Sequence, residues 1–215
     1  MMKTKIQIRK LYQNKRDKLS IGEIHKRSIS LSNKCLKIPI WHMENFHIFL
    51  CLSNKNEIDT SPLLSIIMGK DKQVIVPRII KPNLLEHVIL NDQTLLRTNS
   101  FGIPEPQNGN IISPKIIDVV FTPLYVFDLK GSRVGYGGGY YDRFLEECKK
   151  DTVKVGLSLF EPMNLIQDIS EFDIKLNYAV TPDSIFSFWL KIFLLKKIKI
   201  VIPIEIEASA TLKIY

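Results

Sequence analysis

The sequence is poor in cysteine and histidine, and this scarcity excludes two kinds of architecture. It contains three cysteines, Cys35, Cys51 and Cys148, which are far apart and form no Cys-x-x-Cys pair. Such a set predicts reduced thiols in a cytosolic protein, because it provides neither a disulfide framework nor a metal cluster. The four histidines have no metal-ligand spacing either. We therefore expect neither disulfides nor a structural metal.

Hydrophobic segments long enough for a membrane are also missing. Residues 1–19 are too rich in lysine and arginine to hold the apolar core of a signal peptide. Residues 185–195 are apolar almost throughout, but Lys191 interrupts them and the run is too short to cross a bilayer. From the sequence we expect no membrane contact and a cytoplasmic location.

Glycine is scarce as well, with ten in 215 residues, and two familiar phosphate-binding loops are absent. No Gly-x-x-x-x-Gly-Lys-Ser/Thr sequence occurs, which argues against a P-loop NTPase. The spacing of Gly135, Gly137 and Tyr140 lacks the third glycine of the dinucleotide-binding fingerprint. Neither of these two loops can therefore account for a nucleotide site in this chain.

The glycines that are present gather in one stretch. Residues 131–143 hold five of the ten, together with Arg133, Arg143, Asp142 and three tyrosines. An apolar run precedes this stretch and a helical pattern follows it, which gives the order strand, glycine loop, helix. Glycine allows positive φ and close approach to an anion, while the helix start and the arginines add positive charge. The stretch predicts a nucleotide-phosphate site, and a flexible surface loop is the alternative.

The overall composition fits a single α/β domain that binds an anion. The hydrophobic content of 45% and the charged content of 24% are ordinary for a soluble globular protein. The net charge of +8 suits nucleotide phosphates, a polyglutamate tail or nucleic acid. Because no RNA-binding signature or recognition module is present, nucleic acid is the less favoured partner.

Local signals predict the helices. The capping-box pairs Thr4/Gln7 and Ser20/Glu23 predict helices that begin at residues 5 and 21. A third, short helix is expected with Ser61 as its N-cap and Gly69 past its end. In the second helix, one stripe is expected to face the core: Ile21, Ile24, Ser28, Leu31 and Cys35.

Strands are predicted from short apolar runs. The expected strands are residues 46–52, 74–76, 116–121, 153–159 and 178–181. The first reads as a buried parallel strand, and Pro77 is expected to end the second. Residues 53–60 follow the first strand at its carboxyl end, where open α/β sheets bind ligands. Arg78 lies at the end of the second strand, where it meets either an anion or a carboxylate.

Residues 131–143 resemble the signature of the 5-formyltetrahydrofolate cyclo-ligase family, also called 5,10-methenyltetrahydrofolate synthetases. That signature reads Gly-x-Arg-aliphatic-Gly-x-Gly-x-Gly-Tyr-Tyr-Asp. The resemblance covers residues 3–183, and it departs at Leu124, where the family commonly has glycine. Further short motifs follow in the family's order: Lys5 to Arg9, residues 49–60, Val76-Pro77-Arg78, residues 103–106 and residues 171–173. Several ordered motifs are far more specific than one glycine loop.

The resemblance implies a fold and an activity. It implies a single three-layer α/β/α domain with a mostly parallel central sheet over residues 1–184. Residues 185–215 are then a C-terminal extension of unknown role, in which alternating isoleucines from Ile198 to Ile206 predict an edge strand. The implied activity converts 5-formyltetrahydrofolate to 5,10-methenyltetrahydrofolate, with ATP as co-substrate, Mg²⁺ as cofactor, and ADP and phosphate as products.

The resemblance also implies roles for individual residues. Those expected to bind ATP are Lys5, Arg9, Arg133, Gly135, Tyr136, Gly137, Gly138, Gly139 and Tyr140. Those expected to contact the folate are Leu52, Glu57 and Tyr141. Asp142 and Asp173 are expected to hold Mg²⁺, and Lys5, Arg133 and Asp142 are the expected catalytic groups. Arg143 has a weaker claim, since it can pair with Glu146 or Glu147.

Two alternatives stay open at this point. One is a basic nucleic-acid-binding protein, which rests on net charge alone. The other is a relative that binds folate or ATP without turnover, against which the intact glycine loop and Asp142 argue. The expected partners are the small-molecule substrates, and the expected state is a monomer.

Overall fold

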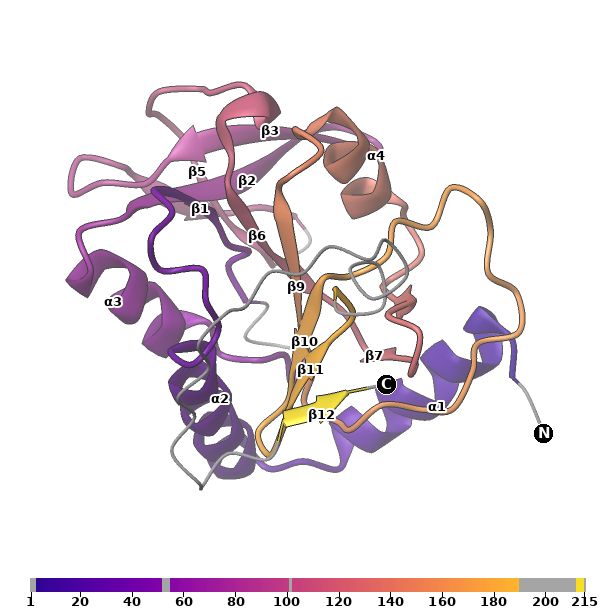
Figure 1. Cartoon of the computed structure of the whole chain (residues 1–215). Helices are drawn as coiled ribbons and strands as arrows, with labels where there is room; N and C mark the ends of the chain where they lie inside the picture. The colour runs from indigo at the N-terminus through magenta and orange to yellow at the C-terminus, as the bar shows by residue number, and fades with distance from the viewer. Residues whose placement is uncertain (1–2, 52–54, 101, 190–211, 215) are drawn as a thin grey trace, which may run out of the picture.

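The computed structural model of the chain describes residues 3–51, 55–100, 102–189 and 212–214. Within them, an eight-stranded sheet has the order β12-β11-β10-β9-β6-β1-β2-β3 (Figure 1). The strands are β1 Asn45–His47, β2 Gln73–Lys81, β3 Leu84–Ile89, β6 Val119–Pro123, β9 Val153–Leu157, β10 Tyr178–Val180, β11 Ile185–Ser187 and β12 Leu212–Ile214.

The central sheet is mostly parallel, as predicted. Neighbouring strands from β2 across β1, β6 and β9 to β10 all pair in parallel. β3 and β11 join this block antiparallel, and β12 pairs in parallel with β11. Two small hairpins lie outside the sheet: β4 Leu96–Thr98 with β5 Pro104–Pro106, and β7 Val126–Phe127 with β8 Arg133–Val134.

The helices begin close to where their caps predict. α1 (Lys5–Asp17) and α2 (Ile21–Cys35) both start with complete capping boxes, at Thr4 and Ser20. α3 (Ser61–Gly69) has Thr60 as its N-cap, so the predicted cap at Ser61 is wrong by one residue. α4 (Tyr140–Glu147) follows the glycine loop, and a short 3₁₀ turn, η2, spans Pro114–Ile116.

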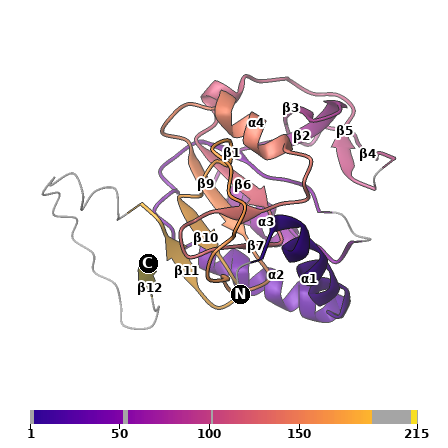
Figure 2. The same ribbon diagram turned by 90° about the vertical axis from the view of Figure 1, so that its right-hand side faces the viewer.

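Helices cover both faces of the sheet, which gives the three layers predicted (Figures 1 and 2). α2 and α3 pack on one face, where Leu31 and Leu63 lie in one core cluster with Phe121. α4 packs on the opposite face, where Phe144 contacts a second cluster that includes Val120. α1 lies against the β7–β8 hairpin, with which it forms a separate apolar cluster. The fold is therefore α/β, and α1 and α4 flank the hairpin that leads into the glycine loop.

One residue of the predicted α2 stripe is wrong. Ile24, Ser28, Leu31 and Cys35 are buried, whereas Ile21 is 83% exposed. Ile21 is the first residue of the helix, so it lies one turn before the part of the helix that packs on the sheet. Periodicity identifies a face of a helix but does not show where its contact with the rest of the protein begins.

Several predicted strand boundaries are also wrong. The strand predicted at residues 116–121 is β6 at Val119–Pro123, and the one predicted at residues 153–159 ends at Leu157. β1 has only three residues, Asn45–His47, although the apolar run continues to residue 52. β2 does not end at Pro77 but continues to Lys81. The reason is that β1 pairs with β2 only as far as Ile75, and beyond this point β3 is the strand that pairs with β2 in the described part of the chain. A proline is tolerated there because one side of the strand needs no N–H donor.

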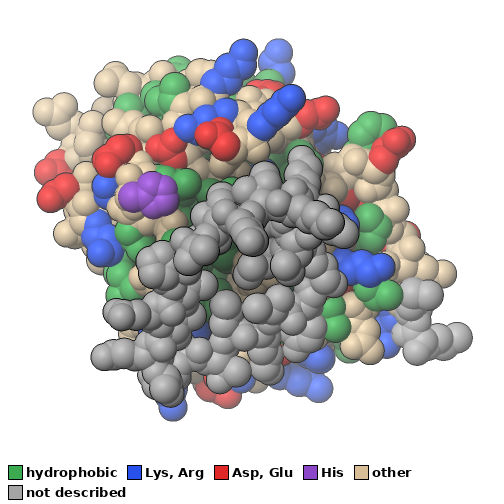
Figure 3. Space-filling view, in the orientation of Figure 1, with side chains coloured by type: hydrophobic (Ala, Val, Ile, Leu, Met, Phe, Trp, Pro, Cys, Tyr) green, Lys and Arg blue, Asp and Glu red, His purple; other side chains and the backbone are tan. Residues whose placement is uncertain are grey.

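The helices and the distribution of charged side chains on the surface indicate whether a membrane or a nucleic acid is a possible partner. No helix in the described part of the chain combines the length and apolar character needed to cross a membrane. On the face shown in Figure 3, described Lys and Arg side chains lie among Asp and Glu and form no continuous basic patch. The described part of this face therefore shows no basic stripe of the kind typical of a nucleic-acid interface.

The region after residue 184 is only partly described. The predicted strand at Ile198–Ile206 lies outside the described residues. β11 starts at Ile185 and pairs with β10, so the central sheet continues past residue 184. The division into a domain at residues 1–184 and an extension at residues 185–215 stays a prediction.

Candidate active site

A cavity of about 570 Å³ opens at the carboxyl ends of the central strands. Leu50 follows β1, Pro77 and Ile79 belong to β2, and Pro123 ends β6, and all four line this cavity. The chain forms β1, then β2 on one side of it, and later β6 on the other side. The cavity therefore lies at the point where the strand order reverses, which is where open α/β sheets bind ligands.

The cavity brings together the residues predicted from the sequence. Those that line it are Lys5, Arg9, Glu57, Arg133, Gly135, Tyr136, Gly137, Gly138, Gly139, Tyr140, Tyr141, Asp142 and Asp173. They come from α1, the loop after β1, the glycine loop with α4, and the loop before β10. Leu52, the remaining predicted folate contact, lies outside the described residues.

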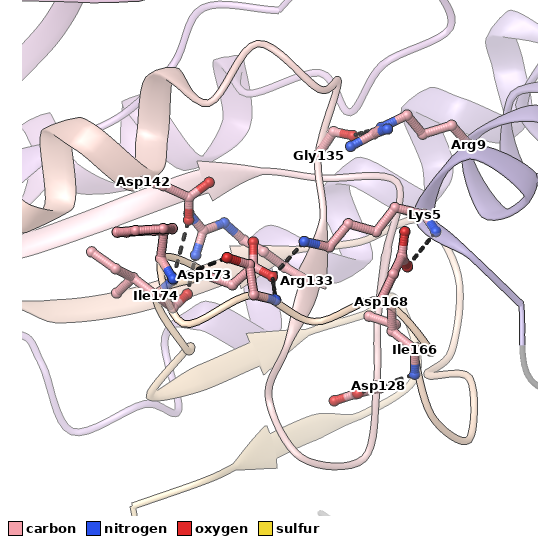
Figure 4. Close-up of polar contacts among 12 residues, drawn as sticks. Lys5, Arg9, Asp128, Arg133, Gly135, Asp142, Ile166, Asp168, Asp173 and Ile174 are labelled. Carbon is pink, nitrogen blue, oxygen red and sulfur yellow. Dashed lines mark hydrogen bonds and ion pairs between the residues drawn. The ribbon is translucent and has the colours of Figure 1, made fainter.

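The β7–β8 hairpin places the glycine loop. Between its strands, the buried carboxylate of Asp128 accepts hydrogen bonds from the backbone N–H groups of Lys130 and Ser132, each at 2.9 Å. It also accepts from the N–H of Ile166 at 3.4 Å, which ties the turn to a distant loop (Figure 4). A carboxylate with several N–H donors fixes a turn firmly. This turn orients β8, and with it Arg133.

Two glycines of the loop have backbone conformations that other residues rarely adopt. Gly137 has a φ of +100° and Gly139, the N-cap of α4, has a φ of +65°. A Cβ atom at Gly137 would lie 3.2 Å from Cζ of Arg9. Arg9 in turn donates from Nε to the Gly135 carbonyl at 2.8 Å (Figure 4). The loop is therefore held by α1 at one end and continues into the N-terminus of α4 at the other, a suitable cradle for phosphate.

Arg133 and Asp142 form an ion pair at the cavity. Nη2 of Arg133 donates to Oδ1 of Asp142 at 2.6 Å, and Nη1 donates to the carbonyl of Ile174. The Ile174 N–H donates back to the same carboxylate oxygen at 3.2 Å. Arg133 is only 7% exposed, and burial lowers its pKa, against the influence of the carboxylates of Asp142 and Asp173. The guanidinium is held in place beside two carboxylates.

Lys5 and Asp173 form a second pair nearby (Figure 4). Nζ of Lys5 donates to Oδ2 of Asp173, which also accepts from the N–H of Ser170 at 2.7 Å. The backbone N–H of Lys5 donates to Oδ1 of Asp168 at 2.7 Å, which fastens the start of α1 to the same loop. Both cationic residues predicted to be catalytic are thus paired with the carboxylates predicted to bind metal.

The predicted folate contacts form another part of the wall. Glu57 is buried and lies 3.9 Å from Nη1 of Arg16. The Tyr141 hydroxyl is buried, and no described group forms a hydrogen bond with it. Burial raises its pKa, and the Glu57 carboxylate adds to this, so the hydroxyl stays protonated and able to donate. A buried hydroxyl without a partner at a cavity wall is suited to a polar atom of a ligand.

The carboxylates fit Mg²⁺ in kind. Asp142 and Asp173 each have one oxygen engaged by a basic side chain, and among the described residues the other oxygen has no hydrogen-bond donor. No cluster of three or more His, Cys, Asp or Glu side chains occurs in the described ranges. Mg²⁺ commonly uses one or two carboxylates plus phosphate oxygens and water, so two carboxylates beside a phosphate loop suffice.

Several lining residues were not predicted as site residues. They are Phe49, Leu50, Lys55, Pro77, Ile79, Leu85, Glu105, Pro123 and Tyr125. Most are apolar residues at strand ends, which no local pattern distinguishes from core. The buried Arg16 also has no signal in the sequence, because it belongs to a helix rich in exposed basic residues.

Two predicted arginines have structural partners. Arg78 donates from Nε to Glu86 at 2.9 Å and from Nη1 to the Pro106 carbonyl at 3.1 Å. Of the two partners predicted for Arg78, an anion or a carboxylate, the structure therefore has the carboxylate. Arg143 donates to the Gly138 carbonyl at 3.1 Å and not, as suggested, to Glu146 or Glu147. It therefore braces the loop from α4.

Comparisons with known proteins agree with this fold. A model of the 5-formyltetrahydrofolate cyclo-ligase family matches residues 1–182. The probable 5-formyltetrahydrofolate cyclo-ligase of Schizosaccharomyces pombe is 30% identical over 84% of this chain and 96% of its own length. The 5-formyltetrahydrofolate cyclo-ligase of Haemophilus influenzae is 33% identical over 71% of this chain and 83% of its own. The structure of 5,10-methenyltetrahydrofolate synthetase from Aquifex aeolicus has a TM-score of 0.75 and 27% identity, and the match covers 86% of this chain and 93% of that one. The chain therefore belongs to the 5-formyltetrahydrofolate cyclo-ligase family.

Proposed function

We propose that the protein converts 5-formyltetrahydrofolate to 5,10-methenyltetrahydrofolate and in the same reaction converts MgATP to ADP and phosphate. The activity follows from the family. The observation that supports the ATP and Mg²⁺ requirement is the composition of a single cavity, where a glycine loop at a helix N-terminus adjoins two cations and two carboxylates. These are the groups that phosphoryl transfer needs for alignment and charge neutralisation.

The reaction needs an activated oxygen. The formyl oxygen is a poor leaving group, so it attacks the γ-phosphorus of ATP, and the bond to ADP breaks. N10 of the folate then attacks the formyl carbon and forms the new C–N bond. The phosphate leaves with the former formyl oxygen, and N10 loses its proton. Atoms and charge balance in these reaction steps, and no oxidant or reductant is needed.

The chain's cations and backbone hold the phosphates. The amides of Gly137 to Gly139 and the N-terminus of α4 face the cavity and suit the β- and γ-phosphates. Arg9 supports this loop through Gly135 and keeps part of its guanidinium for a phosphate oxygen. Lys5 and Arg133 supply the remaining positive charge.

Asp142 and Asp173 would hold Mg²⁺. When bound, the ion neutralises phosphate charge and orients the oxygens for in-line transfer. Each carboxylate would offer the oxygen that its basic partner leaves free, so the pairs with Arg133 and Lys5 need not break when the ion binds.

The apolar part of the cavity suits the pterin ring. Phe49, Ile79, Leu85 and Ile103 line it, opposite the polar glycine loop. Burial of a flat heterocycle against such an apolar wall is favourable, and a few directed polar partners fix its orientation. Glu57 provides an acceptor and the Tyr141 hydroxyl a donor. With the pterin and ATP bound in this way, the formyl group would lie between the pterin wall and the phosphate loop.

One assay tests the proposed function. Purified full-length protein is mixed with 5-formyltetrahydrofolate and MgATP, and the methenyl product is followed by its near-ultraviolet absorbance. We expect product only when both substrates are present, with one ADP formed per product and with inhibition by a chelator of Mg²⁺. Folded protein that forms no product under ATP would contradict the activity. Product formed without ATP would contradict the proposed mechanism.

The state of the protein in the cell is a separate proposal. We propose a cytoplasmic monomer whose partners are its small-molecule substrates. Light scattering over a range of concentrations tests the monomer, and fractionation of cells tests the location. A dimer at assay concentrations would contradict the first of these.

A further inference from the structure

A buried arginine, Arg16 in the last turn of α1, touches both substrate regions without lining the cavity. It is 2% exposed. Its Nη1 donates to the Tyr136 hydroxyl of the glycine loop at 2.7 Å, and its Nη2 donates to the Leu124 carbonyl at 2.9 Å. One guanidinium thus ties α1 to the glycine loop and to the segment between β6 and β7.

The same guanidinium also faces the loop after β1. Nη1 of Arg16 lies 3.9 Å from Oε1 of the buried Glu57. Glu57 further interacts with the Tyr136 hydroxyl. The backbone carbonyl of Arg16 accepts from Nδ2 of Asn56 at 3.3 Å, which fixes this loop to the end of α1. The proposed folate contact and a residue of the proposed ATP loop therefore share one partner.

Aromatic rings complete the surroundings of Arg16. Its Cζ lies 4.5 Å from the centroid of Tyr125 and 5.6 Å from that of Tyr136. The two rings meet edge to face at 4.9 Å. Tyr125 and Tyr136 both line the cavity. Their rings therefore lie between Arg16 and the bound substrates, and the position of Arg16 affects the position of the rings. The guanidinium is buried, so the few groups that contact it must compensate its charge.

We infer that Arg16 is a positioning residue that couples folate binding to the ATP loop. A substrate that bonds to Glu57 changes how the Glu57 carboxylate interacts with Arg16. Arg16 then adjusts its bond to Tyr136, which lies four positions before Tyr140, the first residue of α4. The coupling is reciprocal, because each ligand must change the affinity for the other by the same factor. This inference rests on the proposed function, because it needs both substrates in one cavity.

The test compares Arg16→Lys with the wild-type protein. Lysine keeps a positive charge near Glu57 but cannot hold Tyr136 and Leu124 at once, because it lacks the planar fork. Binding of 5-formyltetrahydrofolate is measured by calorimetry with and without a non-hydrolysable ATP analogue and Mg²⁺. We expect the analogue to change folate affinity by about 5-fold or more in the wild type, within the usual range of coupling. The factor is expected to fall close to one in Arg16→Lys.

Two further variants separate positioning from folding. Tyr136→Phe removes only the hydroxyl that Arg16 contacts and is expected to lose the coupling while the thermal midpoint changes little. Arg27→Lys removes a guanidinium from α2 that donates to the Leu159 carbonyl at 3.3 Å, and it is expected to keep the coupling. If Arg16→Lys does not fold, Tyr136→Phe decides the question.

The outcomes distinguish this inference from the proposed function. Wild-type protein that turns over, but shows no coupling or keeps it in both Arg16→Lys and Tyr136→Phe, overturns the inference alone. Wild-type protein that binds neither substrate overturns the proposed function. In kinetics, the positioning role predicts raised KM values for both substrates in Arg16→Lys. A purely structural role predicts a lower thermal midpoint with both KM values unchanged.

Discussion

Nη2 of Arg133 lies 2.6 Å from Oδ1 of Asp142, so the arginine at the start of the glycine loop is paired with the carboxylate at its end. The sequence motif assigns these residues separate duties, phosphate for one and Mg²⁺ for the other. In the structure each is the partner of the other, and Lys5 and Asp173 repeat the arrangement. The pairs keep four charges in position and compensated until the ligands bring charges of both signs.

Arg133→Lys should raise the KM for ATP. Lysine retains the charge but loses the fork that bonds Asp142 and the Ile174 carbonyl together. A charged hydrogen bond contributes roughly 1.5–3 kcal/mol, so a rise of about tenfold or more is expected. The matched control is Arg97→Lys on exposed β4, which should leave ATP kinetics unchanged. An unaltered KM for ATP in Arg133→Lys would show that the guanidinium does not bind ATP.

Asp142→Asn should abolish most turnover while folate still binds. The amide keeps an oxygen that can accept from Arg133 and Ile174 but loses the charge that holds Mg²⁺. We expect kcat to fall by orders of magnitude, with partial recovery at high Mg²⁺. The control Asp92→Asn changes an exposed carboxylate. If Asp142→Asn keeps near-normal turnover and loses only about 0.3–1 kcal/mol of stability, Asp142 merely complements the α4 dipole.

The parts of the structure that the sequence predicts well are governed by neighbours in the chain. The capping boxes at Thr4 and Ser20 fix the starts of α1 and α2 because their partners lie three residues away. The glycine loop is similarly local, since positive φ at Gly137 and Gly139 requires only the glycines themselves. The family motif then supplies their roles, which composition alone does not.

The parts that were missed depend on residues distant in the chain. Arg16 is a core residue because Tyr136 and Leu124, more than a hundred residues away, supply its acceptors. Likewise Pro77 stays within β2 only because β1 ends early beside it. No pattern within one segment contains this information. The pairing of Arg133 with Ile174 has the same origin.

Gly137→Ala should impair ATP binding more than folding. The φ of +100° is strained for alanine, and the added Cβ would lie 3.2 Å from Cζ of Arg9. We expect a raised KM for ATP, with folate affinity measured without ATP close to that of the wild type. The control Gly22→Ala lies in α2 with open space around it and should change neither value. Equal ATP affinity in Gly137→Ala would show that the loop tolerates a side chain.

Stability should fall as the pH drops below about 6.5, the ordinary pKa of histidine. Burial lowers the pKa of His47 well below that value and lowers the pKa of His87 to about 4, so both rings are neutral in the folded protein. The unfolded chain binds more protons than the folded protein between these values, so the free energy of unfolding decreases with falling pH. Thermal midpoints between pH 7.5 and pH 5 check this.

His47→Phe is the variant that isolates this effect. Neither ring nitrogen of His47 has a hydrogen-bond partner in the described residues, and the ring packs 4.6 Å from that of Phe144. Replacing it by a ring of similar shape should be tolerated and should reduce the pH dependence. His42→Gln, at an exposed position, is the control and should preserve it. The same slope in His47→Phe and wild type would assign the pH dependence to other groups.

The boundary predicted at residue 184 can be decided by two truncations, because β11 lies just beyond it. Phe186 on β11 is 1% exposed and meets the ring of Phe127 at 5.1 Å. Phe127 belongs to β7 and pairs with Arg133 on β8, so this contact supports the hairpin that carries the site. A chain that ends at Ser184 loses Phe186, whereas a chain that ends at Trp189 keeps it.

We expect the chain ending at Ser184 to lose stability and activity together. Removing a buried phenylalanine costs about 3–5 kcal/mol, and Phe186→Ala in the full chain should reproduce that loss. The chain ending at Trp189 should retain more of the thermal midpoint, and Phe172→Ala, at a ring that is 74% exposed, should change it little. Denaturant unfolding and kcat/KM are measured for these four variants and for the full-length protein. If the chain ending at Ser184 keeps the full-length midpoint and kcat/KM, the domain ends at residue 184 and β11 belongs to the extension, because a strand that the core needs cannot be removed without such a loss.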